Sequence, residues 1–500
     1  MEAISHKLNP RTVDFVKSKT VKKMFIGGQF VEAVSNKTFP TYNPANNQIL
    51  AYVAEGDKED IDRAVACARD AFETGPWQRM LPAERARLIY TLADLIERDA
   101  DVFAEIESLD NGKPISEAKG FDVPATVEHF RYYAGWATKI TGDVLPVNVP
   151  NMHNYVRREP IGVVGQIIPW NFPLLMAAWK LGAALATGCT IVLKPAEQTP
   201  LSALYLGKLI QEAGFPAGVV NIVTGFGETA GNALVTHPDV DKIAFTGSTE
   251  VGKLIMSNAA VDLKRVSLEL GGKSPNIIFP DADFSRAVQG SMQAIFFNQG
   301  QVCSAGSRLY IHKSQYDNVL SDMVTHASKV RQGFGIDPKT QMGPLVSEEQ
   351  LTRVTSYINK GLEQGAKIAI GGERGDGDLA RGYFVRPTVF YDVQDEMAIA
   401  QEEIFGPVVA AMPFDDIEDV IARANRSTYG LAAGVWTQNM NTAFTVANRL
   451  KAGSVWINCY NMFDAASPFG GYKHSGIGRE MGEYALENYT QIKSVWVNYN

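Results

Sequence analysis

The sequence has few cysteines and few histidines, and their spacing excludes disulfide-rich and metal-binding proteins. Only four cysteines occur in 500 residues, all far apart, so there is neither a disulfide framework nor a CxxC redox or zinc motif. The seven histidines form no HxxxH pair, and we expect no metal site. Cysteines this sparse favour a reducing compartment, and we predict a cytoplasmic protein.

Long basic runs and membrane-spanning apolar segments are also missing. The net charge is −8 and no run of Lys and Arg exceeds two residues, so we expect no nucleic-acid partner. Between residues 160 and 193 the only charge is Lys180, but two prolines and an asparagine interrupt this stretch near its start. It predicts a buried strand, a loop, a buried helix and a second strand, and we expect no membrane association.

The region after residue 160 alternates between β-prone and helix-prone segments. We expect strands at Val163–Ile168, Thr190–Leu193, Val219–Val223, Lys242–Phe245 and Arg265–Leu270, with helices near 174–187, 200–213, 228–236 and 249–259. This alternation predicts an α/β fold with a parallel sheet covered by helices on both faces, which binds ligands at the carboxyl ends of its strands. A second α/β region is expected after residue 271, with helices near 284–298, 315–332 and 347–364.

Two glycine-rich loops each follow an expected strand and open an expected helix. The first contains Gly227 and Gly231 in the pattern GxGxxxG, one residue longer than the dinucleotide-binding fingerprint. The second contains Phe245, Gly247 and Ser248. Both would place free backbone N–H groups at a helix N-terminus, where a phosphate can bind. An ordinary glycine turn is the alternative for either loop alone.

Polar residues follow two other expected strands. Lys194 ends one strand and Glu197 comes three residues later, where an acid can accept hydrogen bonds from an adenosine ribose. An acid there would repel a 2′-phosphate, so NAD is favoured over NADP; an exposed ion pair in a surface loop is the alternative. Asn171 lies between two prolines, where a rigid amide could donate to an oxyanion, although asparagine is also a common turn residue.

A cysteine and a glutamate stand in unusual local sequence. Cys303 lies among small and polar residues directly after an apolar helix-prone segment, where a thiol can be exposed and reactive. Glu269 lies between two leucines, which would desolvate its carboxylate and raise its pKa, as suits a general base. A buried small hydrophobic residue and a structural glutamate paired with a lysine are the respective alternatives.

Together these residue types indicate oxidation of an aldehyde through a thioester. A thiolate attacks the aldehyde, a hydride leaves to a nicotinamide, and water hydrolyses the acyl-enzyme. Asn171 would stabilise the oxyanion and Glu269 would activate the water. A cysteine hydrolase of the papain type would leave the glycine-rich loops and the Lys194–Glu197 pair unexplained. A binding or structural protein on the same fold is a further alternative.

These residues resemble the NAD(P)-dependent aldehyde dehydrogenase superfamily, close to its broad-specificity tetrameric branch of cytosol and mitochondria. The resemblance runs from about Met24 to the C-terminus. Its motifs are Pro169–Phe172, Lys194–Glu197, Phe245–Ser248, Leu268–Gly272, Gln299–Cys303, Glu402–Pro407 and Ser467–Gly471. Their common order and spacing make the resemblance specific.

The resemblance implies a division into three parts. Residues 1–140 and 161–271 would form a Rossmann-like NAD-binding domain, and residues 272–472 an α/β catalytic domain. Residues 141–160 and 487–500 would form a small β oligomerisation arm, which would account for the apolar C-terminal segment. The expected assembly is a homo-oligomer, with a tetramer favoured by the resemblance.

The resemblance also implies roles that residue chemistry alone does not give. Glu403 would contact the nicotinamide ribose, and Phe405 would lie against the nicotinamide ring. Lys180 and Glu480 would relay protons. The remaining cofactor contacts would come from Ile168, Trp170 and Leu270. The expected cofactor is NAD, with NADP tolerated as an alternative.

An apolar substrate tunnel is implied as well. Its walls would be Phe172, Met176, Trp179, Phe297, Val302, Ser304, Phe463 and Phe469. No arginine stands among these positions to pair with a substrate carboxylate, so a neutral aliphatic or aromatic aldehyde fits better than a charged semialdehyde. Aromatic side chains could instead enclose a quaternary ammonium, which keeps betaine aldehyde as an alternative.

Overall fold

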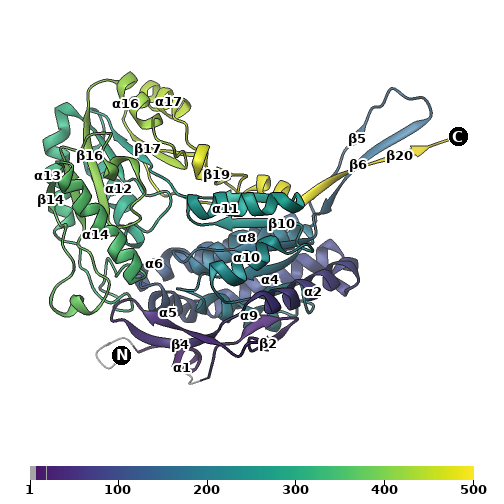
Figure 1. The fold of residues 1–500 in the computed structure, drawn as a ribbon. Coiled ribbons are helices and arrows are strands. Elements are labelled where there is room, and N and C mark those ends of the chain that lie inside the picture. The colour runs from purple at the N-terminus through teal and green to yellow at the C-terminus, as the bar shows by residue number, and fades with distance from the viewer. Residues whose placement is uncertain (1–6, 18–19) are drawn as a thin grey trace.

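Two β-sheets flanked by helices form the body of the molecule, and a narrow third sheet projects from it (Figure 1). The computed structural model describes residues 7–17 and 20–500. Residues 1–6 and 18–19, which belong to the first expected domain, lie outside the described residues. The α/β class expected from the sequence is confirmed.

The first sheet has eight strands in the order β19-β11-β10-β7-β8-β9-β1-β2. They are β1 (Met24–Ile26), β2 (Gln29–Val31), β7 (Val163–Ile167), β8 (Thr190–Lys194), β9 (Val220–Ile222), β10 (Lys242–Thr246), β11 (Arg265–Glu269) and β19 (Gly476–Ile477). The five central strands are parallel, as expected. At the edges β19 pairs antiparallel with β11, β1 with β9, and β2 with β1. Every residue of β7 and β8 is buried, because helices cover both faces, and this explains their largely apolar sequence.

The chain order reverses between two neighbouring strands of this sheet. From β7 the chain continues to β8 and β9 on one side, whereas β10 and β11 lie on the other side. The loops that leave the carboxyl ends of β7 and β10 therefore diverge and leave a crevice, which is the usual ligand site of such a sheet. These loops begin at Ile168 and Gly247.

Helices cover both faces of the first sheet, as expected from the sequence. On one face lie α2 (Lys58–Glu73), α10 (Asn232–Thr236) and α11 (Thr249–Ala259); on the other lie α8 (Pro173–Thr187) and α9 (Leu201–Glu212). α8 has a proline in its first turn and ends at Thr187, and the following Gly188 caps it with a left-handed φ of 96°. Asp57 caps α2, as its side chain accepts a hydrogen bond from the Glu59 N–H at 3.0 Å.

The second sheet has seven strands in the order β14-β15-β16-β13-β12-β17-β18. They are β12 (Pro275–Ile278), β13 (Arg308–His312), β14 (Lys367–Ile370), β15 (Thr388–Tyr391), β16 (Val408–Phe414), β17 (Ala432–Trp436) and β18 (Ser454–Ile457). Its helices are α12 (Phe284–Phe296), α13 (Tyr316–Ala327), α14 (Glu348–Glu363), α15 (Ala398–Gln401), α16 (Ile417–Asn425) and α17 (Met440–Arg449). The expected helix 315–332 is too long, because α13 ends at Ala327 and Gln332 pairs with Met342 in a β-bridge.

The N-terminal region adds a hairpin and a layer of helices. The hairpin is β3 (Thr38–Asn43) with β4 (Gln48–Ala54), and the helices are α1 (Pro10–Lys17), α3 (Pro76–Arg79), α4 (Pro82–Arg98), α5 (Ala100–Asp110), α6 (Ile115–Glu117) and α7 (Val123–Trp136). A π-helical turn, η1 (Ala118–Asp122), joins α6 to α7. Such turns rotate the side chains that follow them and are frequent at functional sites.

The third sheet projects from the body and carries the C-terminus at its tip (Figure 1). It consists of β5 (Val144–Leu145), β6 (Met152–Pro160) and β20 (Thr490–Asn498), with β6 in the middle. Its apolar side chains are exposed, including Val144 at 68%, Ile492 at 67% and Trp496 at 53%. The segments expected for the arm thus pair with one another, while their role in oligomerisation stays a prediction.

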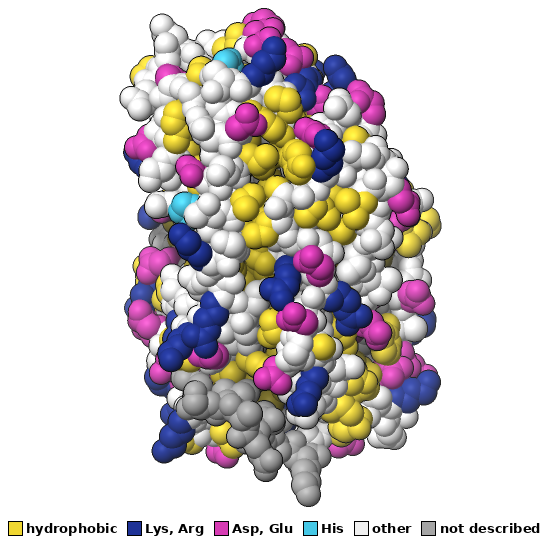
Figure 2. All heavy atoms as spheres, turned by 90° about the vertical axis from the view of Figure 1, so that its left-hand side faces the viewer, with side chains coloured by type: hydrophobic (Ala, Val, Ile, Leu, Met, Phe, Trp, Pro, Cys, Tyr) yellow, Lys and Arg dark blue, Asp and Glu magenta, His cyan; other side chains and the backbone are white. Residues whose placement is uncertain are grey.

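The surface mixes charge and apolar groups. Figure 2 shows hydrophobic side chains gathered along the middle of one face, with acidic and basic side chains interspersed around them. Within residues 7–17 and 20–500, no helix is long and apolar enough to cross a membrane.

Candidate active site

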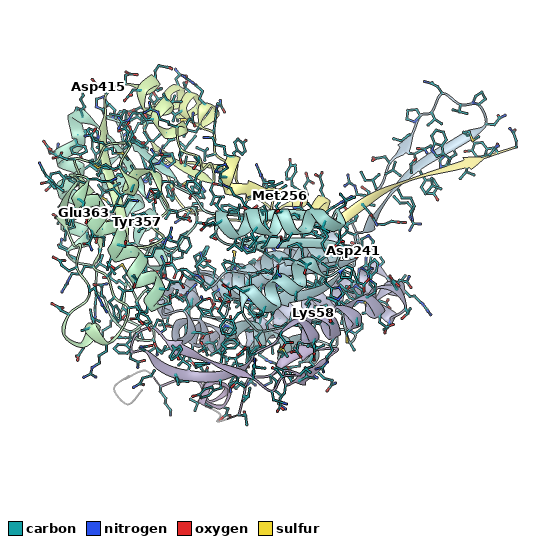
Figure 3. The ribbon with its side chains drawn as sticks, viewed as in Figure 1. Lys58, Asp241, Met256, Tyr357, Glu363 and Asp415 are labelled. Atoms are coloured by element: carbon teal, nitrogen blue, oxygen red, sulfur yellow. The ribbon has the colours of Figure 1, made fainter. Side chains whose placement is uncertain are left out.

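A pocket of about 600 Å³ lies at the crevice in the first sheet and is closed on its other side by segments of the second α/β region. It extends between the N-terminal ends of α11 and α14. In Figure 3 the labels Met256 and Tyr357 identify these two helices. The sequence-predicted residues in its wall are Trp170, Asn171, Phe172, Met176, Trp179, Gly247, Ser248, Glu269, Leu270, Phe297, Val302, Cys303, Ser304, Glu403, Phe405, Phe463 and Phe469. Both halves of the chain therefore contribute to one site.

Cys303 lies in a tightly held loop after α12. The loop passes through three consecutive left-handed residues, Asn298, Gln299 and Gly300, with φ values of 46°, 58° and 71°. The side chain of Gln299 accepts a hydrogen bond from the Gly343 N–H at 3.0 Å. A strained backbone persists only where its surroundings hold it, and this is common at functional sites.

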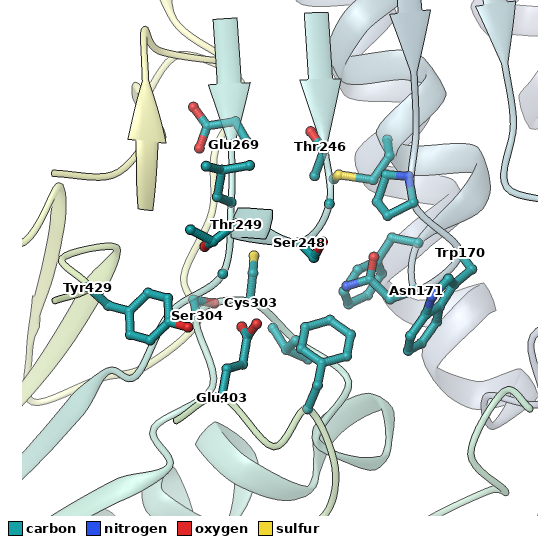
Figure 4. Close-up of a pocket in the computed structure, with 18 of the residues that line it drawn as sticks. Trp170, Asn171, Thr246, Ser248, Thr249, Glu269, Cys303, Ser304, Glu403 and Tyr429 are labelled. Atoms are coloured by element: carbon teal, nitrogen blue, oxygen red, sulfur yellow. The ribbon is translucent and has the colours of Figure 1, made fainter. Parts of the chain in front are cut away.

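The Cys303 thiol is half-buried and points into the pocket (Figure 4). Burial, together with the carboxylates of Glu403 and Glu269, raises its pKa to about 12. The thiol is therefore protonated at neutral pH in this arrangement, and its use as a nucleophile requires a base that removes the proton.

Glu269 is the last residue of β11, where the sequence expected a desolvated carboxylate. Its neighbours Leu268 and Leu270 are buried, and Glu269 itself is 4% exposed. Burial and the nearby Glu480 raise its pKa well above the usual value, whereas Lys180 lowers it. Its Oε2 atom has no hydrogen-bond partner among the described residues, and the carboxylate is turned away from the thiol in Figure 4.

Asn171 lies on the loop after β7, on the opposite side of the pocket from Glu269 in Figure 4. Its side-chain Nδ2 donates to the carbonyl oxygen of Gln301 at 2.9 Å. An amide nitrogen carries two N–H groups, so a second donor remains. The bond to Gln301 also fixes the distance of the amide from the cysteine loop.

Lys180 and Glu480 form an ion pair behind Glu269, outside the wall of the pocket. Lys180 Nζ and Glu480 Oε1 are 2.7 Å apart, and both side chains are buried. The backbone carbonyl of Lys180 accepts a hydrogen bond from Gln166 Nε2 at 2.7 Å. Glu480 is close enough to Glu269 to raise its pKa, so the pair and the carboxylate are electrostatically coupled.

Glu403 and Phe405 lie on the side of the pocket opposite β11. Glu403 accepts a hydrogen bond from the Gly272 N–H at 2.9 Å, and burial raises its pKa to about 7. A Cβ atom at Gly271 would lie 2.3 Å from Glu403 Oε2, so only glycine allows this approach. Phe405 has a φ of 62°, and its ring meets that of Trp170 edge-on at 5.2 Å.

The other predicted cofactor residues lie at the carboxyl ends of the parallel strands. Ser248 caps α11 and accepts from the Val251 N–H at 3.2 Å, so the helix N-terminus faces the pocket. A Cβ at Gly247 would lie 2.4 Å from the ring of Phe245, which is buried beneath it. The glycines let a ligand come close to the backbone, and the N-terminus of α11 can bind a phosphate. Both features fit a dinucleotide.

Some predicted residues lie near the pocket rather than in its wall. Lys194 and Glu197 form an ion pair of 2.9 Å at the end of β8, and Gly231 lies beside the Lys194 side chain. Gly227 and Gly231 belong to a π-helical turn, η2 (Gly227–Gly231), before α10. Ile168 is buried, and its N–H donates to the Lys194 carbonyl at 3.2 Å. These residues lie at or beyond the carboxyl ends of β7, β8 and β9.

The eight predicted tunnel residues all line the pocket, and the aromatic ones among them pack against one another. Trp179 meets Phe469 edge-on at 5.3 Å, and Phe463 lies 5.5 Å from Phe469. Phe121, which was not predicted as a site residue, meets Phe297 edge-on at 5.5 Å. It is placed there by the η1 turn, for which the sequence carries no recognisable signal.

Further wall residues had been given no role from the sequence, although three of them belong to the motifs quoted above. They are Pro169, Leu175, Thr246, Thr249, Glu250, Lys253, Gly271, Glu349, Gln350, Arg353, Tyr429 and His474. Those from residues 246–253 belong to the second glycine-rich loop and the helix that it opens, so that loop was a usable signal. The start of α14 and the segments around 429 and 474 approach the site only through tertiary packing.

Comparisons with a family model, with known sequences and with solved structures all match this chain to aldehyde dehydrogenases. The family model described as aldehyde dehydrogenase family matches residues 30–495. Mitochondrial aldehyde dehydrogenase of Homo sapiens is 55% identical over 95% of this chain and 92% of its own length. The structure of the NAD+ complex of aldehyde dehydrogenase from Bacillus cereus is 60% identical, covers 99% of both chains and has a TM-score of 0.97. The structure of betaine aldehyde dehydrogenase from Staphylococcus aureus in complex with NAD+ is 41% identical, covers 98% of this chain and 97% of that one, and has a TM-score of 0.96.

Proposed function

Because the chain belongs to the aldehyde dehydrogenase family, we propose that it oxidises neutral aldehydes to carboxylic acids with NAD, through a thioester on Cys303. The observation that supports this most is the convergence of Cys303, Glu269 and Asn171 on one pocket from three separate parts of the fold. A thiol, a buried carboxylate and an amide donor are the groups that this reaction needs.

In the first step the Cys303 sulfur attacks the aldehyde carbon. Its raised pKa means that the proton must be taken up as the C–S bond forms, and the Glu269 carboxylate accepts it after a change of rotamer. The carbonyl oxygen becomes an oxyanion, to which Asn171 Nδ2 donates its second hydrogen. The product is a thiohemiacetal on Cys303.

NAD, when bound, would supply the acceptor for the hydride whose loss converts this thiohemiacetal into a thioester. Most of the residues that would hold it lie on loops that follow the parallel strands, whereas Glu403 lies between α15 and β16. The N-terminus of α11 would bind a phosphate and Glu403 would accept from ribose hydroxyls. Glu197 would accept from the adenosine ribose and disfavour a 2′-phosphate, so NAD is preferred to NADP.

Hydrolysis of the thioester completes the cycle. Glu269 first releases the proton that it took from Cys303 and is then a carboxylate again. It takes a proton from water, the resulting hydroxide attacks the acyl carbon, and the Cys303 thiolate leaves with the bonding pair. The raised pKa of Glu269 suits a base that must hold a proton near neutral pH. The buried Lys180–Glu480 pair lies where it could receive that proton and return the carboxylate to its ionised form.

The pocket chemistry favours an uncharged substrate. The part of the wall formed by the eight tunnel residues and Phe121 is almost entirely aromatic and aliphatic. A carboxylate on the substrate would lose its hydration there without meeting a cation, which disfavours a semialdehyde. Betaine aldehyde is the second candidate, because stacked aromatic rings can contact a quaternary ammonium and a betaine aldehyde dehydrogenase shares this fold.

The exposed sheet of β5, β6 and β20 supports an oligomer. Large exposed apolar groups on a projecting sheet are usually covered by another chain, and a second copy of this chain is the simplest cover. We propose a homotetramer, in line with the resemblance described above. The four cysteines are all free, which agrees with a reducing compartment such as the cytoplasm.

The test is NADH formation with NAD, and separately NADP, across aliphatic, aromatic, semialdehyde and betaine aldehydes. Strong turnover of neutral aldehydes with NAD supports the proposal, and Cys303→Ala should abolish it. A Cys303→Ala protein with wild-type turnover would contradict the thioester route. Preference for betaine aldehyde would replace the proposed substrate class while leaving the mechanism in place.

A further inference from the structure

Behind Asn171, on the side away from the pocket, lies a buried lysine that the proposed reaction does not use. Lys113 is fully buried in the turn between α5 and α6. Its Nζ donates to the backbone carbonyl of Asn171 at 3.0 Å and forms an ion pair with Asp122. The same ammonium lies 4.2 Å from the centre of the Phe172 ring, so it contacts two consecutive residues of the pocket wall from behind.

The Asn171 carbonyl accepts a second hydrogen bond from the cysteine loop. Asn298 Nδ2 donates to it at 2.8 Å, and the Asn298 N–H donates to Glu117 Oε2 at 3.0 Å. Asn298 is the first of the left-handed residues that lead to Cys303. One carbonyl oxygen thus joins the turn that carries the amide donor to the loop that carries the thiol.

Burying several charged groups together costs folding free energy, so this cluster calls for a functional explanation. Burial raises the pKa of Glu107 to about 7 and that of Glu117 to about 8, and Lys113 lowers both. Glu107 Oε2 is 3.8 Å from Lys113 Nζ, and one of its oxygens accepts a hydrogen bond from the Leu174 N–H at 3.2 Å. Apolar residues of similar volume often pack such a site at least as stably, so a buried ion cluster is weak evidence for stability alone and favours a positioning role here.

We propose that Lys113 is a positioning residue for the oxidation step, holding the Asn171 turn so that its side-chain amide meets the oxyanion formed on Cys303. The inference rests on the proposed function, because it takes Asn171 as the oxyanion donor. Two donors from different segments leave the carbonyl little freedom to move. A displacement of about 1 Å in such a group can slow a reaction by about 100-fold.

Two variants separate positioning from stability. Lys113→Met removes the donor but leaves Asp122 without its partner, which should lower the melting temperature. Lys113→Met/Asp122→Asn removes the donor together with its nearest carboxylate, so most of the stability should recover while the Asn171 carbonyl stays unheld. Glu107, 3.8 Å from Lys113 Nζ, still loses its cation in this variant. Lys119→Met is the matched control, because Lys119 lies on the neighbouring η1 turn and pairs with Asp101 at 2.8 Å on the surface.

The measurements are the rate of the first-turnover NADH burst, the NAD dissociation constant and the melting temperature. Both Lys113 variants should slow the burst by about 10- to 100-fold with NAD affinity unchanged, whereas Lys119→Met should match the wild type. In an Asn171→Ala background the charge-balanced double substitution should cost less than about threefold, because the group it positions is already absent.

The outcomes against the inference are distinct. If the burst rate recovers with the melting temperature in the charge-balanced variant, Lys113 is only structural. If that variant costs as much in the Asn171→Ala background as in the wild type, Lys113 does not act through Asn171. A wild-type burst in Asn171→Ala would remove the proposed role of Asn171 as well. A slow burst in Asn171→Ala beside unaffected Lys113 variants would overturn only the inference.

Discussion

Removing either partner of the Lys180–Glu480 ion pair should weaken the fold by different amounts. The two charged atoms are 2.7 Å apart and the side chains are 1% and 4% exposed. At an effective dielectric constant of about 20, Coulomb's law gives an attraction of about 6 kcal/mol. Lys180→Met strands a buried carboxylate and should lower the free energy of unfolding by about 3–5 kcal/mol. Glu480→Gln leaves the ammonium a neutral acceptor and should cost only about 1–3 kcal/mol.

The same two variants should move the pH dependence of turnover in opposite directions. Glu480 raises the pKa of Glu269, and Lys180 lowers it. Turnover needs the ionised form of a general base, so its rate rises with pH through that pKa. Lys180→Met should therefore move the rising limb to higher pH, because it removes a cation that favours the ionised form. Glu480→Gln should move the limb to lower pH, because it removes a like charge.

The assays are urea unfolding followed by tryptophan fluorescence, and steady-state NADH formation across the acid and neutral range. Lys180→Met/Glu480→Gln provides the control, since it removes both charges and should recover most of the lost stability. Limbs that move in the same direction for the two single variants would refute the electrostatic coupling. A double variant no more stable than Lys180→Met would refute the stranded-charge explanation.

Three further predictions follow from the site and the arm. Glu269→Gln should slow the turnover that follows the NADH burst more than the burst itself, and equal losses in both would contradict its role as the hydrolytic base. Without cofactor, alkylation of Cys303 should rise roughly tenfold per pH unit up to about pH 9, because its pKa is raised to about 12; a plateau would contradict this, with Cys303→Ala correcting for the other cysteines. Deleting residues 490–500 should lower the mass of the oligomer measured by light scattering. An unchanged mass would show that the arm is not needed for oligomerisation.

The local part of the fold could be read from the sequence, but the arrangement of strands could not. Apolar runs of the right length predicted the five parallel strands because both faces of each strand are buried. Nothing in those runs says that β10 returns to pair with β7 rather than with β9. That choice creates the crevice, and it depends on how the connecting helices pack. The short edge strand β19, of two residues, has too little sequence to carry a pattern.

The candidate site likewise has residues that could be predicted from the sequence and residues that could not. Cys303, Glu269 and Asn171 were found from their immediate neighbours, because reactive groups need unusual local sequence. The tunnel residues came only from the family resemblance, since an aromatic residue in a tunnel looks like one in a core. Phe121 and Lys113 were missed because a π-helical turn and a network of long-range hydrogen bonds place them. Neither leaves a trace in the residues beside them.

The electrostatics of the pocket depend on contacts that no local pattern contains. Glu269, Glu403 and Cys303 would each carry a negative charge if ionised, and all three share the pocket wall. Burial raises the pKa of each, and the two carboxylates raise that of the thiol further. Several negative charges repel one another strongly in a buried pocket of low dielectric constant. A proton that leaves one of these three groups is therefore most readily taken up by another of them. The thiol should therefore give its proton to a neighbouring carboxylate rather than to solvent, which ties the activation of Cys303 to the protonation of the base that later hydrolyses its thioester.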